Sequence, residues 1–406
     1  MLPPEQGEAP LRLPLQGVRV VEFAHMVMGP SCGLALADLG ADVIKVEPLE
    51  GDNTRTLQAA GAGFFPVFNR NKRSLAVDLK RTEGRDIVHR LIDTADVVTE
   101  NFRPGALEKL GFGHAALAER NPRLVYCSLK GFLDGPYQHR AALDEVVQMM
   151  GGLAYMTGLP DRPLRAGSSV VDIVGGTFGA LGVVAALRER ETTGRGRLVT
   201  SALFESTAYL VAQHIAQFEL TGEAPPPMSV KRPAWGIYDI FETAATGSED
   251  ARLFIGVVTD TQWEVFCREF GLADLAADTR LRSNGERVKE RAWLLPRLAE
   301  VFKQYRKADL AAKLEAIGLP YAPISKPWDL LDDPHLKASG GLLETRVPGG
   351  RSFHAPTLPI ALDGKRLPKR SEPPAIGEGA RGVLADLGYG TKEIDALAKE
   401  RVIVLG

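Results

Sequence analysis

The sequence predicts an α/β fold with a parallel sheet and a second, smaller domain, and three observations lead to this prediction. Residues 18–23 form a β-branched run that is typical of a buried strand. Residues 29–40 have a helical pattern, and residues 41–47 form a second strand-like run, so a strand, a helix and a strand follow one another with short connections, as in a parallel sheet. The chain of 406 residues also exceeds what one hydrophobic core usually serves, which favours two domains.

Strands and helices continue to alternate after this unit. Residues 74–79 alternate like a half-buried strand, residues 82–93 have the spacing of an amphipathic helix, and residues 97–99 and 124–128 indicate further buried strands. This order resembles a Rossmann unit, so we expect a Rossmann-like large domain. No GxGxxG sequence lies between the first strand and its helix, so the dinucleotide fingerprint is missing and the sequence does not predict NAD or FAD.

The composition changes after Leu220. The stretch TGEAPPPMSVKRPAW is rich in proline and polar residues and is typical of a linker. Strand-like runs at residues 237–241 and 253–258, followed by charged helices, indicate a smaller α/β domain, and the chain after about Pro334 is rich in loops. The predicted organisation is a large domain over 1–220, a linker over 221–236, a small domain over 237–330 and a final linker and segment over 331–406.

Charge, cysteine content and hydropathy exclude several classes of protein. The net charge of −2 argues against a nucleic-acid partner, because no basic excess is present to displace counterions from a phosphate backbone. The three cysteines lie far apart, without a CxxC pair or the Cys/His spacing of a metal site, so we expect reduced thiols in a cytoplasmic protein and no bound metal.

Residues 1–17 contain prolines and acids where a signal peptide needs a basic start and an apolar run. The longest apolar stretch, 170–187, is interrupted by Asp172 and four glycines, so we expect a buried helix and no membrane partner.

Two loops at the ends of predicted strands carry cationic and hydrogen-bonding groups. One spans Asn69 to Arg73, with Lys80 after the following strand, and the other spans Asn101 to Arg103. Ligands of an open parallel sheet collect at the carboxyl ends of its strands, so two such loops indicate a phosphate-bearing ligand. The alternative is a solvated basic surface, which is the commoner role of a charged loop.

One acid, Asp172, lies at the start of the apolar, glycine-spaced run. We expect Ser168 and Ser169 to cap the unpaired N–H groups of a helix that begins there, and the stretch Gly175 to Gly179 to let another backbone or a ligand approach closely. The positive end of the helix dipole favours the ionised acid, so we expect a carboxylate at neutral pH, as a nucleophile requires. The alternative is that Asp172 only caps an apolar core helix.

Several stretches together resemble the class III CoA-transferases, the family that includes formyl-CoA transferase and carnitine CoA-transferase. They cover most of the chain in the family's order: GVRVVEFAHMVMGP, LADLGADVIKVE, FNRNKRSLAVDLK, ENFRPGALEKLGF, the Asp172 segment with TGRGRLV, and DPHLKASG. The resemblance implies a Rossmann-like domain completed by the C-terminal residues, a small α/β domain and an interlocked homodimer. In such a dimer, folding and association are not separate events.

The resemblance also implies the reaction. The family's aspartate nucleophile falls on Asp172, which would attack the thioester of an acyl-CoA donor to give a mixed anhydride and CoA thiolate. The thiolate would then form an aspartyl-CoA thioester, which an acceptor carboxylate opens. Coenzyme A and acyl-CoA are therefore expected as substrates beside a small carboxylic acid, with no permanently bound cofactor, and an apolar cavity would keep water away from the intermediates.

Matching positions carry over the family's contacts with CoA. Pro48 stands where formyl-CoA transferase has an arginine, and a second arginine is replaced by Lys109, so the resemblance leaves the 3′-phosphate contact open. It places packing contacts at Val27 and Met28, the adenine end at Val77 and Lys80, the nucleotide and phosphates at Asn101, Phe102 and Lys109, and an acid near the reacting groups at Asp144.

Two alternative functions remain from the sequence. The α-methylacyl-CoA racemases belong to the same superfamily, but the histidine that they use falls on Leu143, which cannot exchange a proton, and His139 is the substitute to consider. A CoA-binding subunit without chemistry is expected to lack the aspartate, whereas Asp172 is present.

The acceptor acid is the least defined part of the prediction. Arg140, Arg165 and Arg232 are candidates to hold a second carboxylate, since a guanidinium binds one with two hydrogen bonds; a surface or structural role is the alternative for each. We expect a short dicarboxylic acid as the acceptor, with succinyl-CoA as the donor.

Overall fold

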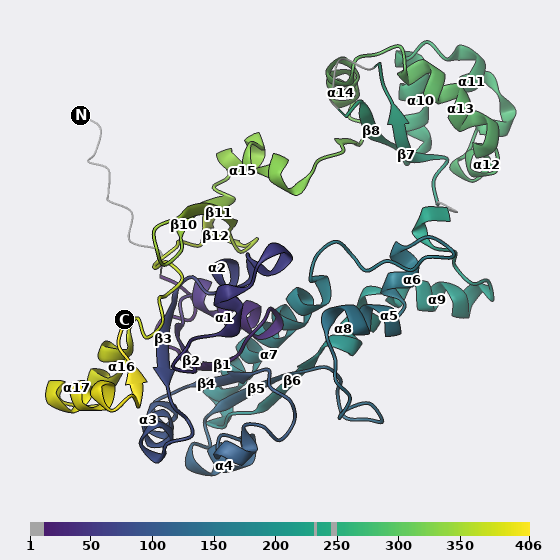
Figure 1. Ribbon diagram of the computed structural model, residues 1–406. Helices are drawn as coiled ribbons and strands as arrows, with labels where there is room; N and C mark the ends of the chain where they lie inside the picture. Colours follow the sequence, from purple (N-terminus) through teal and green to yellow (C-terminus); the bar gives the residue numbers. More distant parts are fainter. Residues whose placement is uncertain (1–11, 231–233, 245–249) are drawn as a thin grey trace, which may run out of the picture. The chain divides into compact units, whose positions relative to one another are not determined.

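The chain forms two compact units. The computed structural model describes residues 12–230, 234–244 and 250–406 (Figure 1). One unit comprises Met1–Ser229 together with His335–Gly406, and the other comprises Val230–Pro334. The larger unit is therefore built from both ends of the chain.

A seven-stranded sheet forms the centre of the larger unit, in the order β14-β3-β2-β1-β4-β5-β6. Strands β1 to β6 pair in parallel, and β14 joins the edge antiparallel to β3. The predicted parallel sheet is thereby confirmed, although β6 and β14 have no counterpart among the predicted strands. The strands are β1 (Arg19–Phe23), β2 (Asp42–Glu47), β3 (Lys72–Val77), β4 (Val97–Glu100), β5 (Val125–Lys130), β6 (Leu198–Ala202) and β14 (Ile403–Val404).

Helices cover both faces of this sheet (Figure 1), which explains why apolar side chains of its inner strands are buried on both faces. Helices α1 and α7 pack on one face, with Leu36 and Val183 in the core between them and the strands. Helices α3, α4, α16 and α17 pack on the other face, around Leu91 and Phe112. The bounds are α1 (Met28–Asp38), α2 (Phe64–Phe68), α3 (Thr82–Asp93), α4 (His114–Arg120), α5 (Asp144–Met150), α6 (Leu153–Thr157), α7 (Val170–Thr193), α8 (Leu203–Leu210), α9 (Ala212–Thr221), α16 (Ala380–Asp386) and α17 (Thr391–Lys399).

The segment that precedes α16 is attached to the first part of the chain by hydrogen bonds. The N–H groups of Arg370 and Ser371 both donate to Asn71 Oδ1, at 2.6 and 2.9 Å. The guanidinium of Arg370 donates to the carbonyl oxygens of Ala37 and Ala41. Before it lie α15 (Pro334–Ala338), the hairpin of β10 (Leu342–Arg346) and β11 (Ser352–Pro356), and the hairpin of β12 (Ala361–Leu362) and β13 (Lys365–Arg366).

The smaller unit contains a three-stranded antiparallel sheet in the order β7-β8-β9 and a group of helices. Its core is aromatic, with Trp263, Phe266 and Phe302 buried together. A capping box of Thr259 and Gln262 opens α10, which shows how local sequence sets this helix start. The elements are β7 (Ile237–Glu242), β8 (Arg252–Val257), α10 (Asp260–Glu269), α11 (Ala273–Ala277), α12 (Asn284–Lys289), α13 (Arg291–Phe302), α14 (Lys307–Ala316) and β9 (Tyr321–Pro323).

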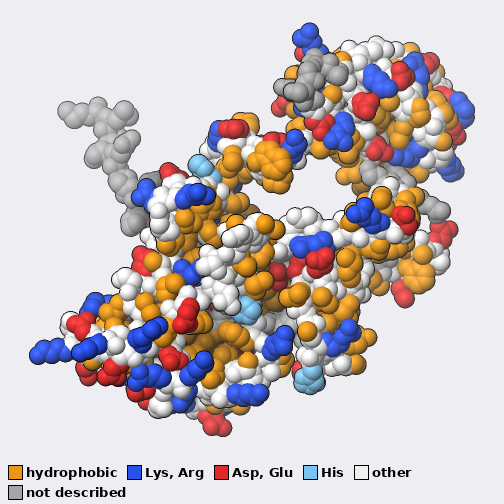
Figure 2. Space-filling model, in the orientation of Figure 1, with side chains coloured by type: hydrophobic (Ala, Val, Ile, Leu, Met, Phe, Trp, Pro, Cys, Tyr) orange, Lys and Arg blue, Asp and Glu red, His pale blue; other side chains and the backbone are white. Residues whose placement is uncertain are grey.

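Helix α7 was predicted to be buried, and about half of it is. It is long and apolar enough to cross a membrane by length and composition, and 44% of its most apolar stretch is buried. Exposed apolar side chains also lie on α8, which packs against α7, and on α9, which packs against α8, and Figure 2 shows apolar side chains over α8 and α9. We call the following exposed side chains the α7–α9 apolar face: Ile173, Leu181, Val184, Tyr209, Leu210, Ile215, Phe218 and Leu220.

Candidate active site

Asp172 lies in the first turn of α7, but the expected serine cap of this helix is wrong. Ser169 occupies the position before the helix, and its side chain makes no capping bond, because its φ of −75° and ψ of 57° are not those of an extended capping residue. Asp144, in the first turn of α5, takes this role. Its Oδ2 accepts hydrogen bonds from the N–H groups of Val171 and Asp172, at 3.0 and 3.2 Å. A buried carboxylate from another helix therefore fixes the backbone of Asp172.

The second oxygen of Asp144 is bound to the loop that leads into α7. Gln148 donates to Asp144 Oδ1 at 2.6 Å and accepts the N–H of Ala166 at 2.8 Å. Arg165 lies 3.3 Å from the same oxygen. Both oxygens of Asp144 thus hold the entry to α7 in place. No local sequence pattern indicates this connection, because the residues lie far apart along the chain.

The acidity of Asp172 also differs from the prediction. Burial disfavours the charged carboxylate and the neighbouring Asp144 repels it, and these effects outweigh the attraction of Arg165, so the pKa of Asp172 rises to about 7. The expectation of a fully ionised carboxylate at neutral pH is therefore wrong, because burial outweighs the helix dipole. A carboxyl group whose pKa is brought close to neutral is typical of catalytic sites.

Helix α1 packs directly against the glycines of α7, which confirms the predicted close approach. A Cβ atom at Gly175 would lie 2.6 Å from Met28 Cε, and one at Gly176 would lie 2.5 Å from the carbonyl oxygen of Met28. Val27 and Met28 are both buried at the start of α1. The structure therefore brings Met28 to the helix that carries Asp172, and Val27 precedes it at the start of α1.

The loop between β1 and α1 has an unusual backbone conformation. Met26 has a φ of 63°, which is rare for a residue with a side chain. Asn101, which follows β4, holds this loop: its Oδ1 accepts the N–H of His25 at 3.0 Å, and its Nδ2 donates to the carbonyl oxygen of His25 at 2.8 Å. The rings of His25 and Phe102 lie 5.2 Å apart. Asn101 and Phe102, both predicted to meet the nucleotide, thus also position the loop that leads to Met28.

A pocket of about 420 Å³ lies at the carboxyl ends of β1, β2 and β3. Its walls include three of the predicted CoA contacts, Val77, Lys80 and Phe102, together with Pro48. Lys109 is not among its lining residues, although the neighbouring Leu110 is. This edge of a parallel sheet is where ligands of such folds bind.

Two residues that sequence reasoning missed hold Phe102 in this wall. Glu100, at the end of β4, accepts the N–H of Phe102 at 2.9 Å. Lys130, at the end of β5, donates to the carbonyl oxygen of Phe102 at 2.9 Å and pairs with Glu100 at 2.6 Å. The signal in the sequence was a charged residue at the end of each of two buried strands.

The predicted basic loop, Asn69 to Arg73, does not form a phosphate site. Arg70 pairs with Asp38 of α1, and Lys72 lies 2.8 and 3.0 Å from the two carboxylate oxygens of Glu22. Arg70 and Lys72 are both buried. The prediction for this loop is wrong, because these two cations neutralise acids that come from β1 and α1.

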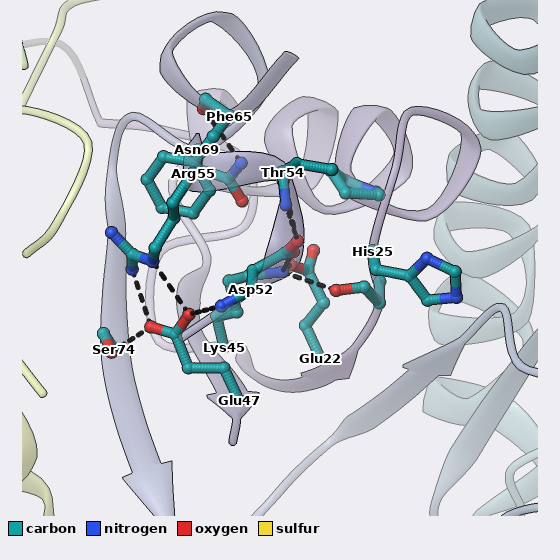
Figure 3. Close-up of polar contacts among 12 residues, drawn as sticks. Glu22, His25, Lys45, Glu47, Asp52, Thr54, Arg55, Phe65, Asn69 and Ser74 are labelled. Carbon is teal, nitrogen blue, oxygen red and sulfur yellow. Dashed lines mark hydrogen bonds and ion pairs between the residues drawn. The ribbon is translucent and has the colours of Figure 1, made fainter. Parts of the chain in front are cut away.

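Lys45 extends this pairing to a second acid. It lies 2.8 Å from Asp52 and 3.7 Å from Glu22 (Figure 3), and all of these groups are enclosed. We call Glu22, Lys45, Asp52 and Lys72 the buried ionic cluster. Over the described residues, no group of three or more His, Cys, Asp or Glu side chains is arranged to hold a metal ion.

Of the residues considered for the racemase and for the acceptor, Leu143 and Arg165 lie beside Asp144, whereas His139 and Arg140 lie in the loop before α5. Leu143 and His139 are both exposed, Leu143 by 63%. Arg140 lies over the ring of Tyr137, and Arg165 is engaged by Asp144. Arg232 lies outside the described residues.

Known proteins match this chain over almost its whole length. The model of CoA-transferase family III matches residues 15–380. The succinate–glutarate CoA-transferase of Agrobacterium fabrum is 34% identical over 387 residues, which cover 92% of this chain and 96% of that protein. The succinyl-CoA:mesaconate CoA-transferase of Haloarcula hispanica is 32% identical, over 93% of this chain and 97% of that protein. The crystal structure of a CAIB/BAIF family protein from Brucella suis has a TM-score of 0.81 at 36% identity, over 93% of this chain and all of that one. With its parallel sheet and these matches, the chain belongs to CoA-transferase family III.

Proposed function

We propose that this enzyme transfers CoA from succinyl-CoA to a short carboxylic or dicarboxylic acid, with Asp172 as the nucleophile. The observation that carries this proposal is the position of Asp172 in the first turn of α7, beside a second acid, with its pKa raised to about 7. Arg165, the cation that lowers its pKa, also pairs with Asp144. A buried acid without a cation of its own weakens the fold, and such groups gather where chemistry needs them.

The names of the relatives support the choice of donor. Both transferases described above are named for succinate or succinyl-CoA. Because the relatives are named as transferases, the family does not favour the racemase alternative. The exposed Leu143, at the position of the racemase histidine, agrees with this preference.

The pocket at the ends of β1, β2 and β3 is the proposed site for the nucleotide part of CoA. Val77 and Phe102 supply apolar walls, and Lys80 supplies a cation at the rim. Lys109, one residue before a lining residue, is the second proposed cation for the phosphates. From Phe102 a continuous series of contacts leads through His25 and the loop to Met28 and then to Gly175, one turn from Asp172, and we place the pantetheine arm along it.

The chemistry follows from a carboxylate near a thioester. Asp172 attacks the thioester carbonyl carbon, the C–S bond breaks, and CoA leaves as a thiolate. A mixed anhydride of Asp172 and succinate remains. The thiolate attacks the aspartyl carbonyl carbon, the C–O bond breaks, and succinate leaves while an aspartyl-CoA thioester forms. The acceptor carboxylate then attacks this thioester, the C–S bond breaks, and a second anhydride forms as the thiolate leaves. The thiolate attacks the acceptor's carbonyl carbon in that anhydride, the C–O bond to Asp172 breaks, and the acyl-CoA product and the free carboxylate of Asp172 result. Thioester energy is conserved because no water takes part.

The α7–α9 apolar face supports the proposed homodimer. Soluble monomers rarely expose apolar side chains contiguously over several helices, and here Leu181 is 63% exposed and Leu220 is 86% exposed. A second copy of the chain is the proposed cover, and Leu181→Asp is expected to shift the mass in light scattering from dimer towards monomer. We place the enzyme in the cytoplasm, in agreement with its three unpaired, buried cysteines.

The experiment measures CoA transfer directly. Purified protein is mixed with succinyl-CoA and a panel of free acids, and the new thioesters are separated by chromatography and identified by mass. Asp172→Asn is expected to lower transfer by at least about 10⁴-fold while CoA binding is retained, because the amide cannot form the anhydride. Asp161→Asn, an exposed acid in the same stretch of chain, is the matched control.

A trapping experiment identifies the nucleophile. After incubation with succinyl-CoA, hydroxylamine or borohydride is expected to modify Asp172, which peptide mass spectrometry locates. Modification of another residue, or unchanged transfer by Asp172→Asn, would contradict the assignment. Deuterium uptake at the carbon next to the thioester without CoA exchange would point to the racemase.

A further inference from the structure

A second pocket, of about 500 Å³, lies between α2 with its preceding residues and the hairpin of β10 and β11. Its walls are mostly apolar and include Phe65, Val67, Val347 and Phe353. It shares no lining residue with the pocket at the ends of β1, β2 and β3. Its volume lies within the range of small-molecule sites.

Two arginines line this pocket, and they differ in whether their guanidinium N–H groups already donate to other residues of the protein. Arg55 donates to the two carboxylate oxygens of Glu47 at 3.0 and 2.6 Å and to the carbonyl oxygen of Pro374 at 2.8 Å. Its guanidinium also lies 3.7 Å above the ring of Phe65 (Figure 3). Arg351 is exposed, and no described carboxylate forms an ion pair with it. Arg351 is therefore the cation that is open to a ligand.

The charge of the walls selects the ligand. Among the described residues, the pocket walls contain no aspartate or glutamate. A guanidinium binds a carboxylate with two hydrogen bonds, and apolar walls stabilise a ligand whose remaining atoms are apolar. We propose that this pocket binds a small monocarboxylate with an apolar body, anchored by Arg351.

The ion pair of Arg55 and Glu47 separates this site from the proposed CoA pocket. Arg55 lines one pocket and Glu47 lines the other. Glu47 is further held by Ser74 and by the N–H of Asp52, so the wall is fixed from both sides (Figure 3). The monocarboxylate and CoA therefore bind without competing, and the site is additional to the proposed transfer reaction.

The test uses the full chain and two matched probes, 4-phenylbutyrate and its neutral analogue 4-phenylbutanol. Calorimetry or ligand-observed NMR is expected to show binding of the acid at about millimolar affinity, as suits a ligand of this size, and weaker binding of the alcohol. Arg351→Gln is expected to weaken the acid about tenfold and to leave the alcohol unchanged. Arg346→Gln, on the same hairpin but outside the pocket walls, is the control and keeps the affinity of the unaltered chain.

A second variant tests the cavity instead of the charge. A Cβ atom at Gly63 would meet only Val67 Cγ2, at 4.0 Å, so Gly63→Leu can fill the pocket without a clash with the backbone. This variant is expected to lose both probes. Absence of acid binding at millimolar concentration, equal affinity in Arg351→Gln, or displacement of the acid by excess CoA would each overturn the proposal. None of these measurements depends on transfer activity, so the proposed binding site can be tested independently of the proposed reaction.

Discussion

The buried ionic cluster and the start of α7 both hold acids that are wholly or partly buried, but the charges around these acids differ. In the cluster, Glu22 lies 2.8 Å from Lys72 and Asp52 lies 2.8 Å from Lys45. At the start of α7, Asp172 has a second acid, Asp144, as its close charged neighbour, and the nearby Arg165 is bound to that second acid. Charge is matched in the first region and left unmatched in the second.

This difference separates a structural role from a chemical one. A matched buried pair holds elements together, because removing one partner leaves an uncompensated charge in the core. An unmatched buried acid weakens the fold and is retained where it reacts. The two regions should therefore respond in opposite directions when their charges are removed.

The largest expected effect comes from breaking the cluster. Lys72→Met leaves Glu22 buried beside only the more distant Lys45, at 3.7 Å, and is expected to lower the free energy of unfolding by about 3–5 kcal/mol. Urea unfolding followed by circular dichroism measures this change. Lys392→Met, at an exposed position on α17, carries the same change of side chain and should alter stability by less than about 0.5 kcal/mol. A loss below about 1 kcal/mol in Lys72→Met would show that the cluster is not a matched structural pair.

The opposite sign is expected at Asp172. Its pKa is about 7 in the folded chain and close to 3.8 when unfolded, so the unfolded chain loses its proton first as the pH rises between these values. Stability is therefore lost between about pH 4 and pH 7, and the whole penalty is present above pH 7. The full pKa difference corresponds to about 4 kcal/mol. Because Asp172 is partly exposed and the amide of Asp172→Asn is itself costly to bury, this variant is expected to raise the free energy of unfolding by about 2 kcal/mol at pH 8 and by much less at pH 4.5. Parallel urea titrations at the two pH values measure this change in stability. If Asp172→Asn is less stable than the unaltered chain at pH 8, the opposite effects expected for the two regions are contradicted.

The sequence predicted the parts of this comparison that depend on neighbouring residues. Apolar runs predicted β1, β2, β4 and β5, an alternating pattern predicted β3, and the glycine-spaced run placed Asp172 in the first turn of a helix. Both follow from periodicity and from the conformational preferences of residues within one element. The close approach of α1 to Gly175 and Gly176 also followed, because only a glycine leaves that space.

The partners of charged groups could not be predicted in this way. Lys72 and Glu22 are separated by 50 residues, and the cap of Asp172 comes from Asp144, 28 residues earlier. A basic loop that neutralises distant acids has the same composition as one that binds phosphate. The serine cap failed for the same reason, since local chemistry favoured Ser169 and a tertiary contact took its place.

A smaller effect is expected on the pH dependence of transfer. Because the carboxylate form of Asp172 is the nucleophile, kcat/KM for the donor should fall about tenfold per pH unit well below pH 7 and level off above about pH 8. Asp144→Asn keeps an oxygen that can accept the N–H groups of Val171 and Asp172 but removes the repelling charge. The apparent pKa of the profile should then move down by up to about one unit. An unchanged or higher value would show that Asp144 does not repel the nucleophile.

The smallest expected effect concerns a lysine that serves a ligand and not the fold. Lys80 is exposed at the rim of the proposed CoA pocket, whereas Lys72 is enclosed in the cluster. Lys80→Met should leave stability within about 0.5 kcal/mol of the unaltered chain, because an exposed charge contributes little to folding. It should weaken CoA binding about fivefold in calorimetry and dephospho-CoA binding by less, since the solvent-exposed cation meets a phosphate. If binding of CoA and binding of dephospho-CoA weaken equally, Lys80 does not contact the 3′-phosphate, and Lys109 is the next cation to test. A loss of stability would instead show that Lys80, like Lys72, contributes to folding. The same Lys→Met substitution at the two positions therefore distinguishes a lysine that stabilises the sheet from one that binds the substrate.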